Sequence, residues 1–198
     1  MTVRIIVPHR GLAAAKTRLA SVLDDAEREA LAQRLLERAL RVAHEACDDS
    51  VVITPSEALE SVVIAAGARL VVQRGMGLNA GLEQARQEAL ADGIALLVVL
   101  HGDLPNLKAD DVRALVAAVP GPKGVAIAPD RGGTGTNGLA MQPPDAIGFA
   151  FGVGSRSAHA ALAEHAGIPF VEVHRPGLAF DVDTPADLAR WLELGDAA

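Results

Sequence analysis

The sequence predicts an α/β protein, a three-layer α/β/α sandwich in which helices cover both faces of a mostly parallel, twisted sheet. Three observations favour this class. Short apolar segments alternate with segments of helical periodicity along the chain. The connections between them are short. Of the 198 residues, 50% are hydrophobic and only 3% are aromatic, so a core of small aliphatic side chains is expected. We expect one domain over residues 1–198.

Apolar and β-branched segments predict strands at residues 3–7, 51–53, 69–72, 94–100, 125–128, 139–141, 170–173 and 179–182. Helical spacing predicts helices at residues 24–46, 55–66, 78–91, 108–119, 155–166 and 185–194. Asp24 or Asp25 can cap the first helix, Gly67 ends the second, and Pro120 stops the fourth. Ligands of such sheets bind beyond the carboxyl ends of the strands. The loops after Val7, Leu100, Ala128 and Phe180 are therefore the ones to examine.

Charge and composition exclude several classes of partner. The formal net charge is −7, which argues against nucleic acid, a partner that usually needs a basic face. The longest apolar run, at residues 94–100, is too short to cross a membrane, and no signal peptide is visible. We therefore expect a cytoplasmic protein without a membrane partner. The single cysteine, Cys47, excludes an internal disulfide.

The loop after the predicted central strand carries Gly102 and Asp103. Gly102 has no side chain, so a phosphate could approach the backbone there. Asp103 could bind a metal ion, or it could stabilise a turn or cap the next helix. The residues alone leave both readings open.

Two further carboxylates, Asp181 and Asp183, alternate in a predicted strand and should face the same side. Two like charges on one face need a cation between them, and Mg²⁺ is commonly held by one or two carboxylates plus substrate phosphates. The alternative is that Asp183 or Thr184 caps the last helix, with Pro185 at its first position. Both roles can hold at once.

Basic and glycine-rich loops suggest anion sites. Arg10, Lys16 and Arg18 surround Gly11 in the first loop, which suits a triphosphate although the spacing is not that of a P-loop. The glycine-rich loop at 131–138 can present backbone N–H groups to an anion, or it can be simply a flexible turn.

Two predicted helix starts add further candidates. Glycines precede Ser155, and His159 lies one turn later, so both could face one ligand. Asn79 could contact a base or ribose, or it could simply cap its helix.

Together, the three carboxylates, the basic first loop and the two glycine-rich loops suggest two phosphorylated ligands and a divalent cation. No Ser-His-Asp order is apparent, and nucleotidyl transfer to a phosphate acceptor needs none. The second pKa of a phosphate monoester is about 6, so the acceptor arrives deprotonated. Catalysis then consists of positioning and charge neutralisation, with pyrophosphate as the leaving group.

Five segments occur in an order that closely resembles the guanylyltransferases of deazaflavin coenzyme (F-420) biosynthesis. They are Ala15–Ala20, His101–Pro105, Gly133–Asn137, Phe151–Gly152 with Ser155 and His159, and Asp181–Pro185. The resemblance covers nearly the whole chain. It implies the fold of the nucleotide-diphospho-sugar transferases (GT-A-like) and transfer of GMP from GTP to a small phosphorylated carboxylic acid. The family's acceptors are 2-phospho-L-lactate, phosphoenolpyruvate and 3-phospho-D-glycerate, of which the first two are favoured here.

The resemblance also implies roles at matching positions. Metal ligands, with Mg²⁺ as cofactor, would be Asp103, Asp181 and Asp183. Contacts to the acid would come from Thr136, Gly152 and Ser155, with His159 beside them. The nucleotide would be bound by Arg10, Lys16, Asn79 and Gly102, and catalytic roles would fall to Lys16, Arg18 and Asp103.

The chain departs from the family pattern at two places. Pro8-His9-Arg10 stands where Val-Lys is usual, and Val153 stands where proline is common. Rival interpretations are another nucleotidyltransferase of this fold, of the molybdopterin or sugar-phosphate type, and a non-catalytic nucleotide-binding regulator. The oligomeric state stays open, a homodimer being one of the options.

Overall fold

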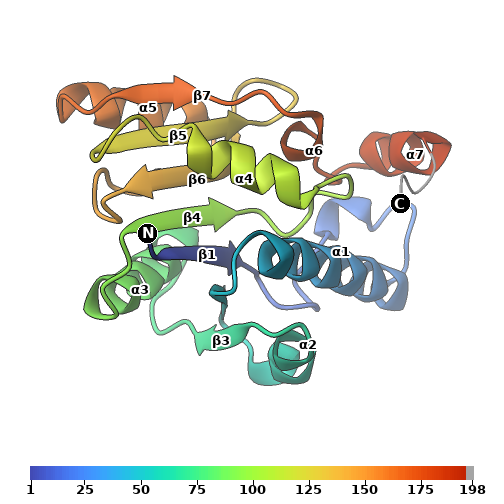
Figure 1. The fold of residues 1–198 in the computed structure, drawn as a ribbon. Coiled ribbons are helices and arrows are strands. Elements are labelled where there is room, and N and C mark those ends of the chain that lie inside the picture. Colours follow the sequence, from blue (N-terminus) through green and yellow to red (C-terminus); the bar gives the residue numbers. More distant parts are fainter. Residues whose placement is uncertain (195–198) are drawn as a thin grey trace.

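The computed structural model describes residues 1–194 and contains one seven-stranded sheet of order β3-β2-β1-β4-β6-β5-β7 (Figure 1). The strands are β1 (Val3–Pro8), β2 (Ser50–Thr54), β3 (Arg69–Val72), β4 (Leu96–Leu100), β5 (Gly124–Pro129), β6 (Thr136–Gln142) and β7 (Phe170–Glu172). The α-helices are α1 (Asp25–Ala46), α2 (Glu60–Ala65), α3 (Leu78–Ala91), α4 (Ala109–Ala117), α5 (Ser155–His165), α6 (Pro176–Ala179) and α7 (Pro185–Leu194). Two 3-10 turns, η1 (Thr17–Leu19) and η2 (Glu57–Leu59), complete the set.

Strand β6 is the antiparallel member of the sheet. It pairs antiparallel with both β4 and β5, whereas β1 pairs parallel with β2 and β4, β2 with β3, and β5 with β7. Because β6 runs in the opposite direction, its first residue, Thr136, lies at the edge where β4 ends. The loop after β4 and the loop before β6 therefore both lie at the edge where ligands of such sheets bind.

Alternating strand residues build a core on each face of the sheet. Ile5 and Val7 pack with residues of α1 and α4 such as Leu36 and Leu115. Ile6, between them in sequence, packs on the other face with residues of α3 and α5. Figure 1 shows α1 and α4 in front of the sheet and α3 and α5 behind it. The predicted three-layer sandwich is confirmed, and the buried strands explain the near-continuous apolar runs.

A third, smaller cluster joins the first loop to the end of the described chain. Leu19 of η1 is buried with Leu31 and Leu35 of α1 and with Phe180, Val182 and Trp191. The basic loop is therefore folded against the segment that carries Asp181 and Asp183.

The predicted strand at 179–182 is wrong. Residues 176–179 form the short helix α6, and the following residues up to 184 lie outside regular structure. The segment is extended beside the loop after β4, where the Val182 N–H donates to the Asp103 carbonyl over 3.3 Å. Phe180 and Val182 are buried while Asp181 and Asp183 are only half-buried. The alternation that suggested a strand is real, but it comes from packing against a core cluster and not from pairing with a strand.

The other strands and helices agree with the prediction to within a few residues. The predicted helix at 55–66 is divided into η2 and α2. Asp24 caps α1 in a reciprocal capping box with Glu27. No helix in residues 1–194 is both long and apolar enough to span a membrane.

Gly177 in α6 has no room for a side chain, which gives a stability prediction. A Cβ there would lie 2.0 Å from Asp111 Oδ2 and 2.8 Å from the Asn106 carbonyl oxygen. Asp111 is itself fixed by an ion pair with Arg175 at 2.8 Å. Gly177→Ala should lower the free energy of unfolding by about 2–3 kcal/mol, the cost of overpacking. Urea unfolding measures this. A matched control is Gly148→Ala, where an added Cβ meets nothing within 4 Å, and equal midpoints for the two variants would contradict the prediction.

Candidate active site

The loop after β1 and the segment that carries Asp181 and Asp183 meet beside the loop after β4. Lys16 is the link between them: its Nζ donates to Asp103 Oδ2 over 2.8 Å and to Asp183 Oδ1 over 3.0 Å. Arg18 NH1 lies 3.6 Å from Asp183 Oδ2 on the exposed side. Four of the residues predicted from sequence, Lys16, Arg18, Asp103 and Asp183, therefore form one cluster.

Lys16 occupies an unusual backbone conformation. Its φ of 53° places it in the left-handed region, where it is the one non-glycine residue with positive φ among those described. Its side chain is only 7% exposed. Burial by itself lowers the pKa of Lys16, but the charges and hydrogen bonds of Asp103 and Asp183 outweigh burial and raise it. Lys16 is therefore a fixed, charged ammonium.

The carboxylates are only partly compensated by this lysine. Burial tends to raise the pKa of Asp103, yet the charges of Lys16 and His101 hold it below its usual value. The second oxygen, Asp103 Oδ1, is buried and has no hydrogen-bond partner among the described residues. The pKa of Asp181 is raised, first by burial and then by the negative charges of Asp103 and Asp183. The cluster thus has an excess of negative charge.

The cap of α7 is built by other residues. The backbone N–H and hydroxyl of Thr184 donate to Asp187 Oδ2 over 2.9 and 2.7 Å. Asp187 N–H in turn lies 3.3 Å from Thr184 Oγ1. Because Thr184 and Asp187 cap the helix, the Asp183 carboxylate is available to face Lys16.

The three aspartates are not preassembled as a metal site. Within residues 1–194 no group of three or more His, Cys, Asp or Glu side chains is arranged to hold a metal ion. The ammonium of Lys16 lies between Asp103 and Asp183 instead.

A second cluster lies around Phe151, which packs between two histidine rings. The centroid of the Phe151 ring lies 5.5 Å from that of His101 and 4.8 Å from that of His159, which it meets edge-on. His159 Nδ1 is 3.2 Å from Thr136 Oγ1, and the Ala150 N–H donates to His159 Nε2 over 3.1 Å. The predicted acid-binding residues Thr136 and His159 are therefore in direct contact.

Ser155 and Gly152 belong to the same loop. Ser155 is the first residue of α5 and is buried, and its N–H donates to the Gly152 carbonyl over 3.2 Å. Gly152 has φ 140° and Gly154 has φ 71°, conformations that favour glycine. The two glycines give the loop the turn that leads into the N-terminus of α5.

The glycine-rich loop at 131–138 directs two of its amides to a side chain of the protein itself. The Thr134 and Gly135 N–H groups donate to Asp130 Oδ1 over 2.8 and 2.9 Å. The carbonyl of Gly133 accepts from Arg156 NH1 over 2.9 Å. A carboxylate of the chain itself therefore takes two donors of this loop, which favours the plain turn over the anion site, and the anion site stays a prediction.

The predicted nucleotide contacts are not gathered in one place. Arg10 is exposed. The Asn79 side-chain amide exchanges two hydrogen bonds of 3.0 Å with the backbone N–H and carbonyl of Phe151. A Cβ on Gly102 would meet Val7 Cγ1 at 3.2 Å and Leu36 Cδ1 at 3.5 Å, so this glycine serves packing against the core. The nucleotide roles of these residues stay predictions.

Two histidines of the site were not singled out from the sequence. His9 is largely buried, and burial lowers its pKa to about 4, with a smaller contribution from Lys16. Its Nδ1 accepts from the Gly11 N–H over 3.0 Å, which shapes the first loop. His101 Nε2 is buried with no partner among residues 1–194. His9 directly precedes Arg10, and His101 stands two residues before Asp103, which could have pointed to both histidines. A lone histidine in a loop, however, is not distinctive by itself.

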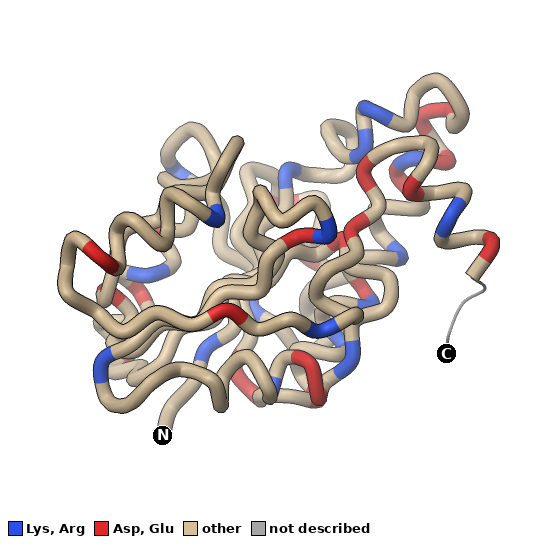
Figure 2. The backbone as a smooth tube through the Cα atoms, turned by 90° about the horizontal axis from the view of Figure 1, so that it is seen from above, with Lys and Arg blue, Asp and Glu red and all other residues tan. Residues whose placement is uncertain are grey.

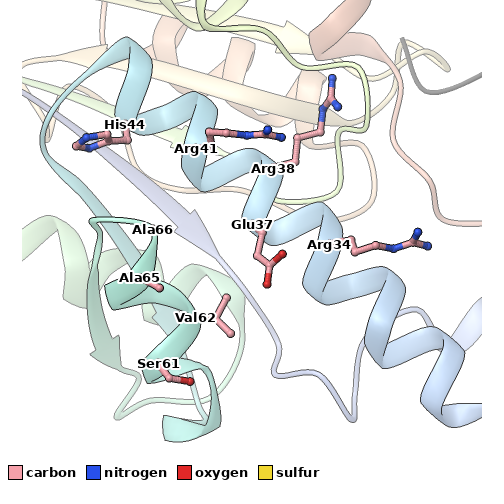
Figure 3. Close-up of a pocket in the computed structure, with 9 residues that line it drawn as sticks. All are labelled: Arg34, Glu37, Arg38, Arg41, His44, Ser61, Val62, Ala65 and Ala66. Carbon is pink, nitrogen blue, oxygen red and sulfur yellow. The ribbon is translucent and has the colours of Figure 1, made fainter. Parts of the chain in front are cut away.

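A pocket of about 710 Å³ lies between α1 and α2, away from the cluster around Lys16. Arginines of α1 such as Arg34 and Arg41 and small residues of α2 line it, as Figure 3 shows. It contains none of the candidate aspartates. Acidic and basic residues are interspersed along the chain, as Figure 2 shows.

The sheet order and the helices on both faces define a nucleotide-diphospho-sugar transferase fold. A protein from Desulfovibrio desulfuricans G20, described as a transferase of that class, superposes with a TM-score of 0.82 at 19% identity over 100% of this chain and 90% of its own. A CMP:2-keto-3-deoxy-manno-octonic acid synthetase complexed with CTP superposes at 0.61, with 18% identity and 98% of each chain covered.

The sequence places the protein more narrowly: residues 3–197 match the family described as "Guanylyl transferase CofC like", and the chain belongs to this family. A phosphoenolpyruvate guanylyltransferase of Sphaerobacter thermophilus is 44% identical over 95% of this chain and 91% of its own. A 3-phospho-D-glycerate guanylyltransferase of Phenylobacterium zucineum is 38% identical over 92% and 86%. The family suggested by the motifs is thereby confirmed, and the protein is a guanylyltransferase.

Proposed function

We propose that this protein is a Mg²⁺-dependent enzyme that transfers GMP from GTP to a small phosphorylated carboxylic acid, in deazaflavin coenzyme biosynthesis. The observation that carries the proposal is that Asp103 and Asp183 flank Lys16 and that Asp181 is close enough for their charges to raise its pKa, so the three carboxylates hold more negative charge than the lysine neutralises. Such a site is suited to a cation that accompanies phosphates.

The donor set fits a hard divalent cation. Asp103 Oδ1 is buried without a hydrogen-bond partner in residues 1–194, and the pKa of Asp181 is raised by burial and by its two acidic neighbours. Mg²⁺ prefers oxygen ligands and keeps several waters or phosphate oxygens. We assign Asp103, Asp181 and Asp183 to this ion, which would neutralise the charge of the two phosphorylated substrates.

The chain's own residues would then bind and orient the substrates. Lys16 and Arg18 are the cations nearest the aspartates and would contact the triphosphate. An oxygen of the acid's phosphate attacks the α-phosphorus of GTP, the bond to the β-phosphate oxygen breaks, and pyrophosphate leaves with the electron pair. No general base is required, because a phosphate monoester with a second pKa of about 6 is already deprotonated at neutral pH.

For the acid we propose phosphoenolpyruvate as the first candidate. The relatives at 44% and 40% identity are named phosphoenolpyruvate guanylyltransferases, whereas the relative named for 3-phospho-D-glycerate is 38% identical. Thr136, Gly152 and Ser155, at the start of β6 and before α5, are the proposed contacts.

A pyrophosphate-release assay tests the function. GTP, ATP, CTP and UTP are each combined with phosphoenolpyruvate, 2-phospho-L-lactate and 3-phospho-D-glycerate, with Mg²⁺ and with EDTA in its place. We expect release with GTP and phosphoenolpyruvate that stops when the metal is removed.

Two results would overturn the proposal. Absence of release with GTP and any of the three acids would exclude the reaction. Undiminished release in EDTA would exclude the metal role of the aspartates. Turnover with CTP or ATP alone would instead identify another nucleotidyltransferase of this fold.

A further inference from the structure

His159 on α5 is completely buried, and both of its ring nitrogens are engaged by the protein. The Ala150 N–H donates to Nε2 over 3.1 Å, and Nδ1 lies 3.2 Å from Thr136 Oγ1. A side chain in this state has no nitrogen left for a substrate.

These contacts determine where the imidazole proton is. The Ala150 N–H group can only donate, so Nε2 must be the unprotonated nitrogen. Burial and the positive charge of His101 lower the pKa of His159 to about 4, so the ring is neutral near pH 7. The remaining proton is on Nδ1, and Nδ1–H donates to the Thr136 hydroxyl.

The hydrogen bond from His159 determines whether the Thr136 hydroxyl can act as a donor toward another group. A threonine hydroxyl has one hydrogen and two lone pairs. When Oγ1 accepts from His159, its own hydrogen is directed elsewhere, and among the described residues the Thr136 hydroxyl makes no other side-chain hydrogen bond. Thr136 is thus poised to donate to an incoming oxygen.

The ring is also held in place by the loop that it supports. His159 packs edge-on against Phe151 at 4.8 Å, and Asn79 pairs with the Phe151 backbone through two bonds of 3.0 Å. Asn79, Phe151, His159 and Thr136 form a continuous chain of contacts from α3 to the start of β6. This chain fixes the loop that contains Gly152.

We propose that His159 is a positioning residue that orients the Thr136 hydroxyl as a hydrogen-bond donor toward a phosphate or carboxylate oxygen of the acceptor acid. His159 does not contact the acid itself, in contrast to the direct contact expected from sequence. The inference rests on the proposed function, in that it takes Thr136 to be a contact of the acid.

The two amides that resemble histidine provide a matched pair of variants. His159→Asn places an N–H near the position of Nδ1 and can still donate to Thr136. His159→Gln places an oxygen near the position of Nε2 and can still accept from Ala150, but it cannot donate to Thr136. Both lose the ring that packs on Phe151, so the difference between them reports on the bond to Thr136.

Steady-state kinetics of the intact protein test the inference. We expect His159→Gln and Thr136→Val to raise the KM for the acid about tenfold or more, with the KM for GTP changed less than about twofold. His159→Asn should be affected less than His159→Gln. The double variant Thr136→Val/His159→Gln should equal Thr136→Val alone, because His159 acts through the hydroxyl. His165→Gln, at an exposed position of the same helix, is the control.

Four outcomes would overturn the inference. They are an unchanged KM for the acid in His159→Gln, equal effects of the asparagine and glutamine variants, multiplicative effects in the double variant, and equal increases in the KM values for the acid and for GTP. The last of these would indicate a purely structural role.

Nitrogen NMR of the histidine rings separates this inference from the proposed function. A neutral His159 protonated on Nδ1 supports the arrangement, and a ring protonated on Nε2 contradicts it, whichever substrate the enzyme uses. If wild-type protein turns over none of the acids, the proposed function fails while the NMR result still decides the orientation of the Thr136 hydroxyl.

Discussion

Replacing Asp183 by asparagine is expected to reduce kcat/KM about a thousandfold or more while leaving the protein folded. The substitution keeps the size of the side chain but removes the charge that faces Lys16 at 3.0 Å and is assigned to the metal ion. Loss of a charged metal ligand removes several kcal/mol of transition-state stabilisation. The cap of α7 is retained, because Thr184 and Asp187 supply it.

Pyrophosphate release and Mn²⁺ binding, followed by electron paramagnetic resonance, measure this effect. The control is Asp145→Asn, at an exposed position of the chain. Thr184→Ala gives the complementary result: it should cost about 1 kcal/mol of stability through the lost cap with little change in turnover. Wild-type turnover and Mn²⁺ binding in Asp183→Asn would show that the acidic pair has no metal role.

Lys16→Met is expected to abolish turnover and to destabilise the protein in the absence of metal. The ammonium is buried between Asp103 and Asp183, whose side chains are 26% and 41% exposed, so its removal should cost less than the about 3–5 kcal/mol of a fully buried ion pair. Mg²⁺ should raise the melting temperature of Lys16→Met more than that of the wild type, since the cation replaces the missing positive charge. Lys123→Met, at an exposed position, is the control.

The pH dependence of this loss follows from the shifted groups. Lys16 depresses the pKa of Asp103, so the stability from this pair is present above the unfolded pKa of aspartate, about 3.9, and is lost as pH falls through the lower folded value. The pKa of Lys16 is raised, so the same stability is lost again only as pH rises through that value. Unfolding free energies of wild type and Lys16→Met should therefore differ most near pH 7 and converge in acid. A difference independent of pH would contradict an electrostatic origin.

Strands and helices were predicted correctly where the pattern of apolar residues matches the way the segment is buried in the fold. Buried strands such as β4 were found because helices cover both faces and every position is apolar. Strand β6 was predicted only at 139–141, since Asn137 and Gly138 are residue types that strands disfavour and they separate Thr136 from the apolar residues. Their pairing with β4 and β5 comes from tertiary contacts, which no local propensity contains.

The site could be predicted in part for similar reasons. The charged cluster of Lys16, Asp103 and Asp183 was found because Lys16 and Asp103 stand in the loops after β1 and β4, and because Asp183 pairs with Asp181 in a segment that alternates with apolar residues. The roles of Asn79 and His159 were not recoverable, because whether a polar side chain faces a ligand or a neighbouring loop depends on partners far away in sequence. The Asp130 carboxylate, which takes the amides of the glycine-rich loop, is another such partner.

The small cluster around Leu19 has a consequence for how the active site opens. Lys16 and Asp183 are 167 positions apart in the chain, and they are held together by the packing of Leu19 with Phe180, Val182 and Trp191 and not by either face of the sheet. Regions with few buried contacts unfold locally at lower free energy than the main core. Amide protons of residues 180–191 should therefore exchange with solvent through partial opening events, well before those of β4. Substrates that bind to both segments should slow this exchange. The exchange rate would then report the fraction of enzyme with substrate bound, even when turnover is not followed.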